Sequence, residues 1–106
     1  MPKYLLQVNY TLDGVKGVVA KGGSARKAAA SAAAKSAGGK VESFYFAFGG
    51  TDVFCLADMP SNEAAAALAL TVSAGGGATV NTIVLLTPDE IDAATSTKVK
   101  YTPPGG

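Results

Sequence analysis

Residues 40–58 have the sequence KVESFYFAFGGTDVFCLAD, and they constrain the architecture more than any other part of the chain. Two runs within them, 40–48 and 51–58, are rich in aromatic and β-branched residues, which is typical of strands. Gly49-Gly50 lies between the two runs and is a two-residue turn signal, because the turns that hairpins favour need positive φ at both central positions. The stretch therefore predicts a β-hairpin.

The segments on either side of the hairpin complete a β-α-β-β-α-β order. Their start and stop signals are capping residues (Thr11, Ser24, Ser61 and Thr87) and glycine interruptions. The predicted flanking elements are strands over residues 3–10 and 78–86 and helices over 12–20, 25–37, 62–74 and 88–94.

This element order predicts an α+β, ferredoxin-like fold. We expect a four-stranded antiparallel sheet in the order 4-1-3-2, with both main helices on one face and a short C-terminal helix after the last strand. The predicted domain spans residues 1–94, and residues 95–106 form a polar tail that ends in two prolines and two glycines.

Both faces of the predicted hairpin are apolar. If Phe48 opposes Thr51, one face carries Phe44, Phe46, Phe48, Val53, Cys55 and Ala57, and the other carries Val41, Tyr45, Ala47, Phe54 and Leu56. Helices on one side would leave the second face in water, where each large side chain forfeits about 1.5–3 kcal/mol of burial. We therefore expect a second copy to cover it and predict a homo-oligomer, with a two-fold dimer as the commonest arrangement.

Composition excludes several classes of protein. A net charge of +1 argues against a nucleic-acid partner, which needs a basic surface, and the absence of histidine removes the usual catalytic base. The most apolar stretch, 64–74, is too short to span a bilayer, so no membrane association is expected. A single cysteine cannot close an internal disulfide, and together these features predict a cytoplasmic protein.

A candidate ligand site lies along the first strand. Gln7 and Asn9 are two residues apart, so they share a face of a central strand, and Asn81 belongs to the neighbouring strand. With Tyr10 and Asp52 they form the predicted ligand-binding set, because a pocket with a few convergent polar groups is the usual ligand site. The alternatives are that the amides form a buried network that fixes the register of a dimer, or that Asn9 simply ends the strand.

Three further groups of residues point to chemistry less strongly. Residues 21–27, KGGSARK, place cations at a helix N-terminus that suits an anion, but they lack the spacing of a phosphate-binding loop. Cys55 lies in an apolar strand, where burial silences a thiol. Asp52 and Asp58 bracket one strand about 20 Å apart, too far for paired carboxylate catalysis. No metal and no cofactor is predicted.

Three motifs resemble the GYD domain family. They are NYTLDGVK at 9–16, GGKV at 38–41 with FGGTDV at 48–53, and DMPSNEAA at 58–65. The resemblance covers about residues 3–87 and implies a small ferredoxin-like domain akin to dimeric α+β barrels, without an established general activity. Thr51 stands where the family signature has tyrosine. An alternative explanation of Gly49 and Asp52 in this signature is that they only stabilise the hairpin turn. The glycine would then adopt positive φ, and the aspartate would accept hydrogen bonds from turn N–H groups.

Two classes of function remain open. The first is a non-catalytic oligomeric module, structural or ligand-binding, that assembles through its open sheet face. The second is a cofactor-free enzyme of the dimeric α+β-barrel type, such as a monooxygenase or isomerase, with a pocket near Gln7, Asn9, Tyr10 and Asp52. A desolvated Asp52 beside Asn9 would favour the enzyme, since burial raises the pKa of a carboxyl toward that of a base.

Overall fold

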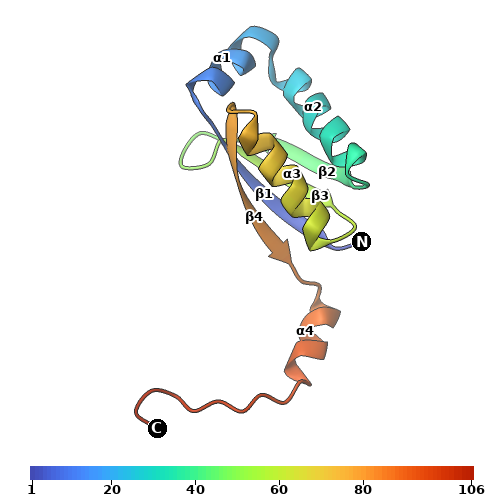
Figure 1. Ribbon diagram of the computed structural model, residues 1–106, viewed down its shortest axis with the longest axis vertical. Coiled ribbons are helices and arrows are strands. Elements are labelled where there is room, and N and C mark those ends of the chain that lie inside the picture. The colour runs from blue at the N-terminus through green and yellow to red at the C-terminus, as the bar shows by residue number, and fades with distance from the viewer.

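The computed structural model describes residues 1–106, which form four strands and four helices (Figure 1). The strands are β1 (Lys3–Tyr10), β2 (Lys40–Phe46), β3 (Val53–Asp58) and β4 (Ala78–Leu85). The helices are α1 (Leu12–Lys21), α2 (Gly23–Ser36), α3 (Asn62–Ala74) and α4 (Pro88–Thr95). The predicted order of elements is confirmed.

The strands form one antiparallel sheet in the order β2-β3-β1-β4, which is the predicted 4-1-3-2 order counted from the opposite edge. Helix α2 packs on β2 and α3 packs on β4, so both main helices lie on the same side of the sheet (Figure 1). This arrangement confirms the ferredoxin-like fold.

From Ser43 to the loop, the β2–β3 hairpin has the predicted register, but its turn differs. Phe46 pairs with Val53, and the Ala47 N–H donates to the Asp52 carbonyl at 2.9 Å, so four residues form the loop. Neither Gly49 nor Gly50 has positive φ, and the prediction that both need it was wrong. Loops of this length are commonly built around a type I turn, which negative φ satisfies.

A β-bulge in β2 changes which face one predicted residue occupies. The register shifts between Val41 and Ser43, so Val41 pairs with Ala57 instead of keeping step with Tyr45. Val41 consequently packs against the core beneath the helices, and its predicted place on the face of Tyr45 was wrong. An extra residue in one strand reverses the alternation beyond it, which the hydrophobic pattern alone does not reveal. Phe48 lies in the loop and is fully exposed.

The ends of α2 differ in how well they were predicted. The helix begins after Gly22, whose φ of 85° turns the chain directly out of α1, and the predicted Ser24 cap makes no capping hydrogen bond. At the other end Gly38 has φ 85°; its N–H donates to the Lys35 carbonyl at 3.0 Å, and the Gly39 N–H donates to the Ala34 carbonyl at 2.9 Å. This pair of bonds is a Schellman motif and confirms the predicted glycine C-cap.

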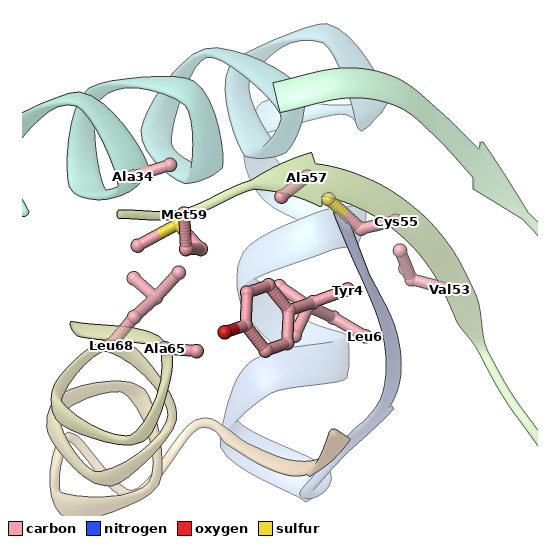
Figure 2. Close-up of a cluster of buried hydrophobic side chains, with 9 residues drawn as sticks. All are labelled: Tyr4, Leu6, Ala34, Val53, Cys55, Ala57, Met59, Ala65 and Leu68. Atoms are coloured by element: carbon pink, nitrogen blue, oxygen red, sulfur yellow. The ribbon is translucent and has the colours of Figure 1, made fainter. Parts of the chain in front are cut away.

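The core fills the space between the sheet and the helices (Figure 2). Tyr4, Val53 and Met59 are its largest fully buried side chains. The Tyr4 hydroxyl donates to Asn62 Oδ1 at 2.6 Å, so β1 is joined to the start of α3 and the buried phenol keeps a partner. The buried members of the core are Tyr4, Leu6, Ala34, Val53, Cys55, Ala57, Met59, Ala65 and Leu68.

The start of α1 is held against the loop between α3 and β4. The Thr11 N–H donates to the Gly77 carbonyl at 3.0 Å, and the Thr11 hydroxyl donates to the Gly76 carbonyl at 2.8 Å. Gly14 faces the same Gly77 carbonyl, and a Cβ at position 14 would overlap it. The backbones approach this closely only because residue 14 has no side chain.

The C-terminal segment stands away from the rest of the chain (Figure 1). Every residue of α4 is exposed, and the chain extends 56 Å along its longest axis. Its radius of gyration is 16.8 Å, compared with about 13 Å for a compact domain of this length. None of the helices combines the length and apolarity that crossing a bilayer requires.

Candidate functional site

The two faces of the sheet present different side chains. We call the face under α2 and α3 the covered face, to which β1 contributes Tyr4, Leu6, Val8 and Tyr10. The opposite face is the open face, because no helix packs on it (Figure 1). Its central members, which follow from the strand register, are Leu5, Gln7, Tyr45, Phe54, Leu56, Asn81 and Ile83.

Asn9 and Asp52 of the predicted site meet at one end of the sheet. The Asp52 N–H donates to Asn9 Oδ1 at 3.1 Å, and the Tyr10 N–H donates to Asp52 Oδ2 at 2.8 Å. Asp52 is half-buried, and these contacts fasten the hairpin loop to β1. The sequence predicted that this aspartate accepts from the N–H groups of its own turn. It accepts instead from the N–H of Tyr10 in β1, so that prediction was wrong.

Gln7 and Asn81 form a second, separate contact on the open face. Asn81 Nδ2 donates to Gln7 Oε1 at 2.9 Å across β1 and β4, and Phe54 flanks Gln7 on the other side. The pairing gives each amide a partner within the sheet. Their binding role stays a prediction, as does the alternative that they set the register of a dimer.

The Tyr10 side chain lies on the covered face, because side chains of β1 alternate across the sheet. Its ring stacks with that of Phe46, with centroids 6.4 Å apart. The predicted set is thus divided among three places: the Asn9–Asp52 contact, the Gln7–Asn81 pair, and Tyr10 beneath the helices.

Tyr10 helps to line a cavity of about 110 Å³ between the covered face and the helices. Helix α2 contributes alanines (Ala29, Ala30 and Ala33), whose single methyl groups leave space above the sheet. Cys55 is part of the wall, and burial raises its pKa to about 11, so the thiol stays neutral as predicted. Sequence reasoning missed the cavity, although the run of alanines facing larger residues is the signal for it.

A cleft of about 410 Å³ adjoins the cavity near the start of α2. Its wall includes Lys21 and Arg26 from the predicted KGGSARK segment, together with Asp13. Arg26 and Tyr10 line both the cleft and the cavity. The two spaces therefore combine an apolar interior with a cationic entrance. No group of three or more Cys, Asp and Glu side chains is placed to hold a metal ion.

A network of two ion pairs lies at one end of the open face. Lys3 Nζ lies 2.7 Å from Glu42 Oε2 and 2.9 Å from Asp58 Oδ1. Hydrogen bonds to Glu42 and Asp58 raise the pKa of Lys3, and the hydrogen bond from Lys3 lowers the pKa of Asp58. This network was not predicted, because the bulge that places Glu42 beside Lys3 is set by strand pairing.

The fold and these sites define a small α+β domain with a ferredoxin-like sheet, one helix-covered face and one open face. The family model for the GYD domain matches residues 4–95. The chain belongs to the GYD domain family, as its motifs predicted. No curated protein and no solved structure matches the chain.

The structure gives the family signature of this chain a local role. Thr51 occupies the tyrosine position in the loop between β2 and β3, and Asp52 makes the contacts to β1 described above. Gly49 has no positive φ. In this chain Asp52 fastens the hairpin to β1, and Gly49 does not use left-handed backbone.

Proposed function

We propose that the protein is a self-assembling module in which two copies pack through their open sheet faces. The observation that carries this proposal is a continuous apolar area on the open face. Leu5 of β1 pairs with Leu56 of β3 and with Ile83 of β4, so three large aliphatic residues form one row across neighbouring strands.

Aromatic residues lie beside this row, in the next row of the open face toward β2. Phe54 pairs with Tyr45, and the two side chains are 38% and 71% exposed. Large side chains left in water forfeit about 1.5–3 kcal/mol of burial each, and an apolar patch of this kind on a sheet marks an interaction surface. A second copy supplies a matching surface, because a two-fold axis brings the same face together with itself.

The C-terminal segment supports the proposal independently. It carries exposed apolar side chains that nothing in its own chain covers: Leu86, Ile91, Val99 and Tyr101. The segment extends beyond the sheet (Figure 1), where it is available to lie across a neighbouring copy. We expect assembly to take place in the cytoplasm, where a lone thiol such as Cys55 stays reduced.

Sedimentation equilibrium of the purified chain tests the proposal. The wild type should have twice the mass of one chain at tens of micromolar, and Phe54→Lys should shift it to the monomer by placing a charge in the interface. Leu70→Lys is the matched control, since Leu70 is 71% exposed on α3, on the other side of the sheet. A monomeric wild type, or equal effects of the two substitutions, would refute assembly through the open face.

A further inference from the structure

We propose that the cavity beneath α2 and α3, together with the adjoining cleft, binds a small organic carboxylate with an aromatic or short aliphatic body. The site lies on the covered face, so it is distinct from the proposed interface. It also differs from the predicted set of Gln7, Asn9, Tyr10, Asp52 and Asn81, of which it includes only Tyr10.

The inner cavity sets the size and polarity of the body. Its volume of about 110 Å³ approaches that of apolar cavities that stay dry and bind a benzene ring. Arg26 is the only charged residue in its wall, and the neutral Cys55 thiol adds no charge. Filling such a space with an apolar group restores the contacts that the short alanine side chains leave unmade.

The entrance sets the charge of the head group. Arg26 is half-buried and lies within 4 Å of no carboxylate in the chain, although it reaches both the cavity and the cleft. Lys21 lines the cleft as a second cation, and the one acidic residue there, Asp13, pairs with neither. A guanidinium binds a carboxylate through two parallel hydrogen bonds, so a planar monoanion fits this entrance best.

Tyr10 lies where the apolar and cationic parts meet. Its ring lines both spaces, and its hydroxyl makes no hydrogen bond within the chain. A phenol at such a boundary offers an apolar surface to the body of a ligand and a donor to its head group. From the inside outward, the site therefore presents an apolar wall, then Tyr10, then the cations. This order fits a ligand whose apolar body lies in the cavity and whose carboxylate lies at the entrance.

Isothermal titration with phenylacetate and 4-phenylbutyrate tests the site, with phenylacetamide as the uncharged counterpart. The wild type should bind the carboxylates more tightly than the amide. Arg26→Gln should weaken carboxylate binding about tenfold and leave amide binding unchanged, because it removes one charge-assisted contact. Lys27→Gln is the matched control, since Lys27 is exposed on the next position of α2 and lines neither space.

A second pair of variants tests the body of the site. Ala30→Leu should abolish binding of all three probes by filling the cavity, whereas Ala28→Leu, on the exposed side of α2, should not. Circular dichroism and thermal unfolding confirm that each variant is folded.

The inference is overturned if the wild type binds none of the probes below about 10 mM, or if Arg26→Gln and Lys27→Gln behave alike. Binding that emerges only after removal of residues 87–106 would also overturn it, since the C-terminal segment of another copy would then fill the cavity. Sedimentation of Arg26→Gln should give the same mass as the wild type, which separates a failure here from a failure of the proposed assembly.

Discussion

The covered and open faces of one sheet use similar amino acids for different purposes. Leu5 and Leu6 are neighbours on β1, yet Leu6 is 6% exposed beneath the helices and Leu5 lies half-buried on the face that no helix covers. The covered face holds the fold together, and we expect the open face to join copies of it. Hydrophobicity therefore does not distinguish a residue of the covered face from one of the open face; the position of the helices does.

Truncating the two leucines tests this contrast with the largest expected effect. Leu6→Ala should lower the free energy of unfolding by about 2–5 kcal/mol, because it leaves a cavity in the core. Leu5→Ala should cost the dilute monomer less than about 1.5 kcal/mol and instead weaken self-association. Urea unfolding at two protein concentrations measures both effects. If the two variants lose equal stability at low concentration, the faces do not differ as described.

Substituting two glycines of α1 by alanine should change the free energy of unfolding in opposite directions. Gly14→Ala should lower the free energy of unfolding by about 1–3 kcal/mol, because its Cβ would overlap the Gly77 carbonyl. Gly17→Ala has open space around the new methyl group and should raise it by up to about 1 kcal/mol through helix propensity. Thermal unfolding compares them; a stabilised Gly14→Ala would show that α1 does not rest on the α3–β4 loop.

Loss of the contact between the hairpin and β1 should have an intermediate effect on the free energy of unfolding. Asp52→Ala removes the acceptor of the Tyr10 N–H and should cost about 1–3 kcal/mol, whereas Thr51→Ala, one residue earlier in the loop, should cost less than about 0.5 kcal/mol. Amide hydrogen exchange at Tyr10 reports the lost bond directly. Unchanged exchange in Asp52→Ala would contradict the fastening role of this carboxylate.

The ion pairs at the edge of the open face should have the smallest effect, because Lys3 and Glu42 are exposed to solvent and Asp58 is only half-buried. Asp58 has a lowered pKa, so its contribution is present above its ordinary value of 3.8 and is lost as pH falls through the lower folded value. Lys3 has a raised pKa, so its contribution is present below its ordinary value of 10.5 and is lost as pH rises through the higher folded value.

Lys3→Met should therefore be less stable than the wild type between about pH 4 and pH 10, and the difference should shrink in acid and in 1 M salt. Lys27→Met, an exposed lysine without an acidic partner, is the control. A pH-independent difference between Lys3→Met and the wild type would assign the effect to packing rather than charge.

Much of the fold followed from local signals. The aromatic runs on either side of Gly49-Gly50, the caps Thr11, Ser61 and Thr87, and the glycine end of α2 all lie where the structure has them. Each of these signals depends on residues close in sequence, because turns, caps and strand alternation are properties of short segments. The predicted sheet order followed from the order of elements.

The candidate site was less accessible to such reasoning. Tyr10 was grouped with Gln7 and Asn9, although alternation along β1 turns its ring to the opposite face. The cavity beside Arg26 depends on where α2 and α3 sit over the sheet, and the Lys3 network depends on the bulge at Glu42. These features join residues from distant parts of the chain, so no pattern within one segment contains them.

The amino-acid sequence alone determined the type and order of the elements, the family, and the surplus of apolar residues on the sheet, since these depend on local propensity and composition. Only the tertiary structure decided which apolar residues are buried, which amides pair and where empty space remains. The physical reason is that burial and hydrogen bonding between strands and helices depend on packing across the whole chain, and a single extra residue such as Glu42 is enough to change it.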